Sequence, residues 1–145
     1  MDAASLVGRI PVSYEAHGET QNVVEVRGVN KNYKRTVALR DIDLDVRQGE
    51  VFGLIGPDGS GKSSLIRAIA GVQQYDAGII TVFGTRIDSE RSAERIKRRI
   101  GLMPQGLGNN LYPELSIDEN IDYFAGLRLV PKNALRDRKD QLLAM

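Results

Sequence analysis

Residues 56–63 have the composition of a phosphate-binding loop. They read Gly-Pro-Asp-Gly-Ser-Gly-Lys-Ser, which matches the pattern G-x-x-x-x-G-K-[ST]. Phosphate oxygens need several converging N–H donors, and the three glycines allow the backbone to approach them closely. The ammonium of Lys62 can reach the β and γ phosphates, and the hydroxyl of Ser63 can ligate Mg²⁺. The spacing predicts a nucleotide-phosphate site, and the alternative is a glycine turn followed by a serine-rich helix start.

The segments on either side of this loop supply the elements that must position it. Residues 51–55 are a nearly continuous apolar run, which predicts a strand buried on both faces of a parallel sheet. Residues 63–70 place Leu65, Ile66 and Ile69 on one helical face, and Gly71 is a suitable stop for that helix. A buried strand before the loop and an amphipathic helix after it form the context that a phosphate loop requires.

The rest of the chain alternates predicted strands and helices after a tail. Residues 1–22, which include His17, lack periodicity and predict a weakly ordered arm. Ser116 and Glu119 have the spacing of a capping box, and Pro131 suits the first turn of a further helix. The pattern also predicts strands from residue 23, around Ile42, Leu44 and Val46, at residues 79–83 and at 100–103, with a charged helix at 88–99.

Composition excludes several classes of function. The chain has 145 residues, a formal net charge of +1, no cysteine and a single histidine. Thiolate zinc sites, disulfide scaffolds, cysteine nucleophiles and histidine clusters are therefore excluded. A near-zero charge argues against non-specific binding of polyanions, and no window of 18 apolar residues could span a membrane. The basic residues of 91–99 interleave with Glu90 and Glu94, which favours a solvated helix face over a nucleic-acid site.

Beyond the loop itself, residues 53–65, with Ile69, Ala70 and Gly71, closely resemble the ATP-binding cassette (ABC) ATPases. So does Tyr33 placed before residues 37–44. The resemblance implies that ATP and Mg²⁺ are the cofactors and that Tyr33 stacks on adenine, although a packed aromatic at a strand end is the alternative. The nucleotide contacts so implied are Tyr33, Gly56, Pro57, Asp58, Gly59, Ser60, Gly61, Lys62, Ser63 and Ser64.

Residues 100–105 resemble the Q-loop of the same family. The resemblance implies that Gln105 contacts Mg²⁺ or the attacking water and reports the nucleotide state to a membrane partner, so that Lys62 and Gln105 share the catalytic roles. Residues 111–116 look like the start of the helical subdomain and are especially similar to multidrug or ABC-2-type exporters. The fold implied is α/β: a truncated P-loop core, an N-terminal antiparallel β subdomain and the beginning of a helical subdomain, over residues 23–145.

The sequence also departs from the family pattern. Asp58 stands where the family more often has asparagine, and it adds a negative charge beside the phosphates. The 145 residues contain no signature motif, no Walker B strand ending in Asp-Glu and no switch histidine. Positioning and charge stabilisation for phosphoryl transfer are then incomplete. We therefore expect an N-terminal part of a longer ATPase, which binds nucleotide poorly and hydrolyses almost none on its own.

The resemblance implies a function in export across a membrane, driven by ATP. The implied partners are a transmembrane permease and a second ATPase domain, at the cytosolic face of the membrane, with no specific nucleic acid. A soluble ABC-type ATPase acting on ribosomes or DNA, or a nucleotide-dependent interaction module, is the alternative. A P-loop GTPase would need Asn-Lys-x-Asp to read guanine, and residues 30–33 lack the final aspartate.

Overall fold

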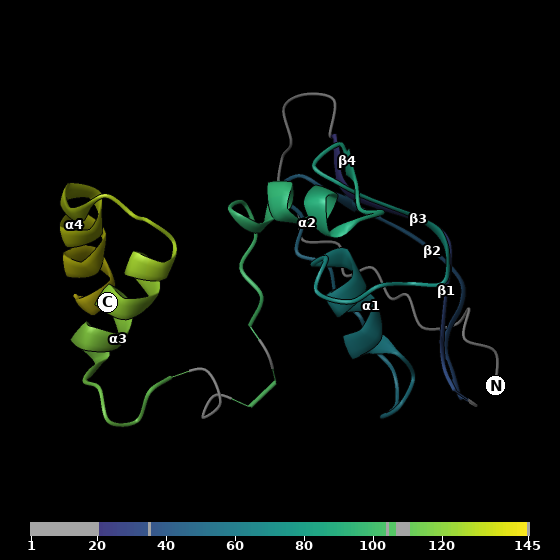
Figure 1. The fold of residues 1–145 in the computed structure, drawn as a ribbon, viewed down its shortest axis with the longest axis horizontal. Helices are drawn as coiled ribbons and strands as arrows, with labels where there is room; N and C mark the ends of the chain where they lie inside the picture. The colour runs from purple at the N-terminus through teal and green to yellow at the C-terminus, as the bar shows by residue number, and fades with distance from the viewer. Residues whose placement is uncertain (1–20, 35, 104, 107–110, 145) are drawn as a thin grey trace. The chain divides into compact units, whose positions relative to one another are not determined.

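The computed structural model describes residues 21–34, 36–103, 105–106 and 111–144. The chain divides into two compact units, Met1–Ile100 and Gly101–Met145, and each is described by itself (Figure 1). The tail predicted over residues 1–22, with His17, lies outside the described residues except at its end. There Asn22 already begins the first strand.

The first unit is built on a four-stranded antiparallel sheet. Its strands are β1 (Asn22–Tyr33), β2 (Thr36–Arg47), β3 (Ala77–Val82) and β4 (Thr85–Arg86), in the order β2-β1-β3-β4. Each neighbouring pair is antiparallel. The apolar alternation predicted for Ile42, Leu44 and Val46 is confirmed in β2, since Leu44 is buried and the other two side chains pack partly against the core. The predicted antiparallel β subdomain is confirmed.

Two short helices, α1 (Lys62–Ile69) and α2 (Glu90–Lys97), complete the core of this unit (Figure 1). In β1, Val26 and Val29 are both fully buried although they are three residues apart. A register shift lies between them, and Gly28 there has φ 56°, so a bulge returns Val29 to the buried face. The buried cluster joins Val26, Val29, Leu39, Leu44, Leu65, Ala68, Ile80, Val82, Ile87, Ala93 and Ile96.

Gly71 ends α1, as predicted. Its N–H donates to Ala68 O at 3.0 Å and the N–H of Val72 donates to Arg67 O at 3.0 Å, which is the pattern of a Schellman cap. Gly71 has φ 68°, and a Cβ placed on it would lie 2.6 Å from the Cβ of Ala93. The cap therefore needs glycine both for its backbone conformation and for the close approach of α1 to α2.

The strand predicted at residues 51–55 is wrong. This segment is neither strand nor helix, and Val51 and Ile55 are 69% and 61% exposed. Phe52 and Leu54 are half-buried against the core, so only one face of the segment is covered. A strand buried on both faces needs a hydrogen-bonded neighbour, and no strand among the described residues pairs with this segment.

The strand predicted at residues 100–103 is also wrong. The segment has no regular structure, Met103 is 78% exposed, and only Ile100 packs partly against the core. Here too, none of the described strands pairs with the apolar run. Pro104, the predicted stop, lies outside the described residues. The charged helix predicted at 88–99 is confirmed in shorter form as α2, where Lys97 and Glu94 form an ion pair of 2.6 Å.

The second unit consists of α3 (Ile117–Leu127) and α4 (Lys132–Leu143), preceded by a turn. The capping box predicted from Ser116 and Glu119 is confirmed at the start of α3, and its hydrogen bonds lower the pKa of Glu119. Pro131 stands one residue before the first turn of α4, as its N-cap. Lys139 of α4 joins the two helices by ion pairs of 2.7 and 2.8 Å to Asp118 and Asp122.

Candidate functional site

The phosphate loop leads directly into α1. The chain turns at residues 58–59, where the N–H of Ser60 donates to Pro57 O at 3.3 Å. Gly61 is the N-cap of α1, with φ 93°, and the helix has no side-chain hydrogen bond at this cap. The first N–H groups of a helix have no intrahelical partner, and the helix dipole adds partial positive charge there. The loop and the start of α1 therefore form a suitable site for an anion.

Gly61 is packed against the backbone of β2. A Cβ at this position would lie 2.1 Å from Ala38 O and 3.0 Å from Cδ2 of Leu39. Gly59 in the same turn has φ 79°, but a Cβ there would meet no atom within 4 Å. Gly59 is therefore needed only for the backbone conformation of the loop. Gly61 is needed for its conformation and also because it allows β2 to pack against the loop.

Lys62 holds its ammonium over the loop. Its Nζ donates to Gly56 O at 2.6 Å, to Pro57 O at 2.7 Å and to Ser60 Oγ at 3.3 Å. The positive charge is thus held at the loop by three of the loop's own oxygens, beside the start of α1. An anion bound by the loop would gain both this charge and the helix N–H groups.

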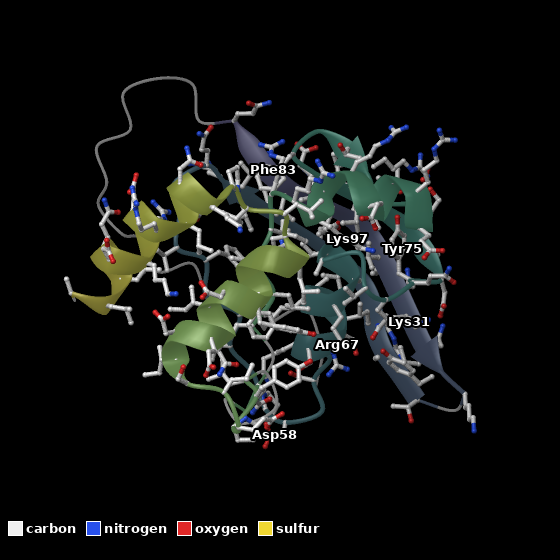
Figure 2. The ribbon with its side chains drawn as sticks, turned by 60° about the vertical axis from the view of Figure 1, so that its left-hand side comes forward. Lys31, Asp58, Arg67, Tyr75, Phe83 and Lys97 are labelled. Carbon is white, nitrogen blue, oxygen red and sulfur yellow. The ribbon has the colours of Figure 1, made fainter. Side chains whose placement is uncertain are left out.

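Tyr33 meets the first turn of α1 from the end of β1. Its Oη lies 3.3 Å from Oγ of Ser64, although 31 positions separate the two residues. The tyrosine is 42% exposed, and Nζ of Lys31 lies over its ring, 5.5 Å from the ring centroid. Figure 2 shows Lys31 on the long strands of the sheet. The structure therefore brings the aromatic residue and the phosphate loop together.

The remaining predicted site residues differ in placement. Asp58 is exposed at the tip of the loop (Figure 2), and Ser63 is exposed in the first turn of α1. A serine hydroxyl there is a hard oxygen ligand of the kind that Mg²⁺ accepts alongside phosphate oxygens and waters. Gln105 is exposed at a bend in the second unit, and its contact with Mg²⁺ stays a prediction. Among the described residues, no group of three acidic or histidine side chains could hold a metal by itself.

Sequence reasoning missed a charged cluster beside Tyr33. The carboxylate of Asp76 accepts hydrogen bonds from Lys31 Nζ at 3.0 Å, from the Asn32 N–H at 2.6 Å and from Asn32 Nδ2 at 3.2 Å. Lys31, followed by the Asn32 N–H, lowers the pKa of Asp76 below its usual value. Asp76 is 44 and 45 positions from its partners, so no local sequence pattern could have signalled the cluster.

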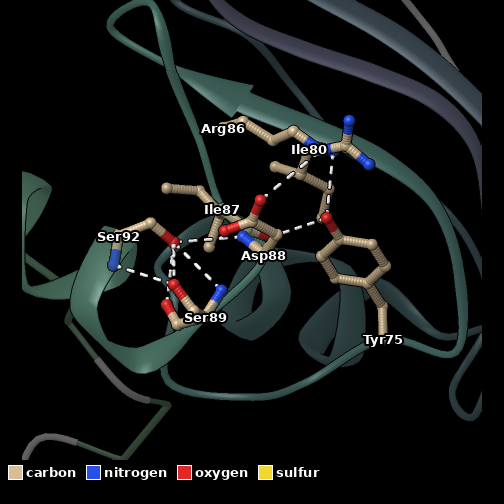
Figure 3. A network of polar contacts seen from close by, with 7 residues as sticks. All are labelled: Tyr75, Ile80, Arg86, Ile87, Asp88, Ser89 and Ser92. Carbon is tan, nitrogen blue, oxygen red and sulfur yellow. Dashed lines mark hydrogen bonds and ion pairs between the residues drawn. The ribbon is translucent and has the colours of Figure 1, made fainter.

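A second polar network supports the segment that carries Asp76 (Figure 3). Tyr75 donates its hydroxyl proton to Ile87 O at 2.6 Å and accepts from the N–H of Ile80 at 3.4 Å. Ser89 and Ser92 close a capping box at the start of α2. These bonds join the chain after α1 to β3 and to the start of α2. Tyr75, Ile87 and Ser89 also line a hollow of about 580 Å³, whose lining includes no residue of the phosphate loop.

Comparison with known proteins identifies the family. The ABC transporter family model matches residues 39–145. The spermidine/putrescine import ATP-binding protein PotA of Nitratidesulfovibrio vulgaris is 37% identical over 127 residues, which are 88% of this chain and 33% of that protein. The chain thus spans about a third of the length of this curated relative.

Solved structures agree with the family match. CbiO1 of Clostridium perfringens, described as part of the ABC transporter complex CbiONQ, has a TM-score of 0.75 at 28% identity. The match covers 87% of this chain and 50% of that one. A dimeric ATP-binding cassette in a post-hydrolysis state, bound to ADP and Pi, has a TM-score of 0.69 at 26% identity, covering 83% and 56%. The chain therefore belongs to the ABC transporter family, and its fold is that of the family's ATPase cassette.

Proposed function

We propose that residues 56–63 and the first turn of α1 bind the triphosphate of Mg-ATP, as the nucleotide site of an ABC transporter ATPase. The observation that carries the proposal is the position of the Lys62 ammonium, held by Gly56, Pro57 and Ser60 beside the uncapped start of α1. A cation and free N–H groups converge there, which suits a polyanion.

Each side chain at the site then has a distinct role. Lys62 neutralises the β and γ phosphates, and Ser63 contributes one oxygen ligand to Mg²⁺. Tyr33 offers its exposed ring to adenine, because stacking requires no hydrogen-bond match. The contact of Gln105 with Mg²⁺ or the attacking water, which the family resemblance implies, stays a prediction. When bound, the metal would supply charge neutralisation at the phosphates.

The activity of the whole protein is part of the same proposal. We infer that it couples ATP hydrolysis to transport, with a permease and a second cassette as partners, at the cytosolic face of a membrane. Export stays a prediction, since PotA is named as an import protein. Among the described residues, the helices are too short or too polar to span a bilayer.

Because the 145 residues lack a signature motif and a Walker B Asp-Glu, we expect weak nucleotide binding and negligible ATP turnover from this chain alone.

The dependence of ATP binding on Mg²⁺ tests the proposal. In an NMR titration of the ¹⁵N-labelled chain, ATP should saturably shift the amides of the loop and of the first turn of α1. A dissociation constant of about 1 mM corresponds to about 4 kcal/mol and is measurable in this way. Mg²⁺ should strengthen binding by about tenfold, or 1.4 kcal/mol.

Substitutions at Ser63 provide the matched comparison. Without Mg²⁺, Ser63→Ala should bind ATP as tightly as the wild type, but it should lose the gain in affinity that Mg²⁺ gives. Ser63→Thr should keep that gain because the hydroxyl remains. A full Mg²⁺ gain in Ser63→Ala would rule out the role of Ser63. The absence of any saturable shift in a folded wild-type chain would rule out the nucleotide site itself.

A further inference from the structure

The end of β1 carries a cluster of contacts that phosphate binding does not use. Asp76 accepts hydrogen bonds from the Lys31 ammonium, the Asn32 N–H and the Asn32 side-chain amide. Its own N–H donates to Asn30 O at 2.8 Å. The side chain of Lys31 is only 15% exposed, whereas that of Asp76 is 40% exposed. The hydrogen bonds of this one aspartate therefore hold the segment before β3 against the end of β1.

The contacts of Asp76 lie at the part of β1 where its pairing with β2 is irregular. The pairing of β1 with β2 shifts register between Val29 and Lys31 and again between Lys31 and Asn32. Lys34, which follows the strand, has φ 50°, an unusual conformation for a lysine. The last two residues of β1 pair with β2, as Asn32 with Val37 and Tyr33 with Thr36, but these pairs are offset from the rest of the ladder. The Asp76 contact to the Asn32 N–H, at 2.6 Å, supplies a fixed point next to Tyr33.

The same cluster also constrains the ring of Tyr33. The Lys31 ammonium, held by Asp76, lies over the ring at 5.5 Å from its centroid. The ring hydroxyl lies 3.3 Å from Ser64 Oγ on α1. One ring face, the hydroxyl and the adjoining backbone are thus each held by a contact. Fixing an exposed aromatic residue before a ligand arrives reduces the entropy lost on binding.

We propose that Asp76 is a positioning residue for Tyr33, holding Lys31 against one face of the ring so that the other face is presented to the adenine of the nucleotide. This inference rests on the proposed function and adds a residue to it. Asp76 touches neither the phosphates nor the base. It acts through Lys31 and Asn32, whose hydrogen bonds also lower the pKa of its carboxyl below the usual value.

The test compares two probes that share phosphates but differ in the base, ATP and inorganic tripolyphosphate, each with Mg²⁺. Asp76→Asn keeps the shape of the side chain and removes its charge. It should weaken ATP binding by about three- to tenfold and leave tripolyphosphate affinity unchanged within about twofold. The matched control is Asp137→Asn on α4, whose carboxylate is 74% exposed and lies 3.9 Å from Nε of Arg136. It should leave both affinities unchanged.

Two further readouts separate positioning from general structural support. In a Tyr33→Ala background, Asp76→Asn should have no additional effect on ATP affinity, because the residue that it positions is absent. In the unliganded chain, Asp76→Asn should raise the hydrogen-exchange rate of the Asn32 amide by about tenfold and leave that of Val26, in the middle of β1, unchanged. Asp76→Glu should recover part of the ATP affinity, because it restores the charge.

The possible outcomes are distinguishable. Equal weakening of both probes in Asp76→Asn, an additive effect in the Tyr33→Ala background, or unchanged exchange at Asn32 would each overturn the role of Asp76. A wild-type chain that binds ATP no better than tripolyphosphate would remove the adenine platform and this inference with it, and would leave the phosphate site intact. A wild-type chain that binds neither probe would instead overturn the proposed function, and with it the role of Asp76 in nucleotide binding.

Discussion

Replacing Gly61 by alanine should destabilise the first unit by about 3 kcal/mol and abolish nucleotide binding. The backbone there has φ 93°, which costs a non-glycine residue about 1–2 kcal/mol. The added Cβ would also lie 2.1 Å from Ala38 O, a backbone atom that cannot move without displacing β2. Overpacking of this kind costs about 1–3 kcal/mol more. Urea unfolding followed by circular dichroism, together with an Mg-ATP titration, measures both effects.

Gly59→Ala is the matched control, because it lies in the same loop. Its φ of 79° is also unfavourable for alanine, but a Cβ there would meet no atom within 4 Å. We expect a loss of about 1–2 kcal/mol in stability and a folded chain that still binds nucleotide. Equal losses of stability in the two variants would contradict the close packing of the loop against β2.

Replacing Ile80 by alanine should have an effect on stability of similar or greater size. Ile80 is fully buried at the centre of the core in β3. Truncating such a side chain removes buried apolar surface and leaves a cavity, which costs about 2–5 kcal/mol. Since domains are stable by only about 5–15 kcal/mol, a large fraction of Ile80→Ala molecules should be unfolded in moderate urea.

Its neighbour Ile79 provides the control on the same strand. Ile79 is 40% exposed, so Ile79→Ala loses the same β-branched residue without opening a buried cavity. We expect a loss of about 1 kcal/mol or less. The difference between the two unfolding free energies then isolates burial from strand propensity. A loss for Ile79→Ala as large as that for Ile80→Ala would contradict the assignment of the buried face of the sheet.

The phosphate loop could be predicted from the sequence because its chemistry restricts nearly every position. Gly61 must accept a positive φ and a close backbone neighbour, and Lys62 must follow it at the start of the helix. The stop at Gly71 and the capping box at Ser116 were predictable for the same reason. In each case the signal is local, because the residue satisfies a backbone requirement within four positions of itself.

The errors arose where structure depends on distant partners. The apolar run at residues 51–55 has the composition of a buried strand, but composition cannot supply the neighbouring strand that it must pair with. The contact of Asp76 with Asn32 joins positions 44 apart, and both residues are polar and exposed. Neither periodicity nor a turn signal marks such a pair, so the fixed end of β1 became visible only in the structure.

The central claim is that residues 56–63 bind the phosphates of a nucleotide through Lys62, and a calorimetric Mg-ATP titration tests it most directly. The wild-type chain, shown to be folded by circular dichroism, should give saturable heat. Lys62→Ala should weaken binding by at least about tenfold, because it removes the only side-chain cation placed on the loop oxygens in the described structure. Lys132→Ala, an exposed lysine at the start of α4, should bind as the wild type does. A folded chain without saturable heat, or equal affinity in Lys62→Ala, would contradict the claim.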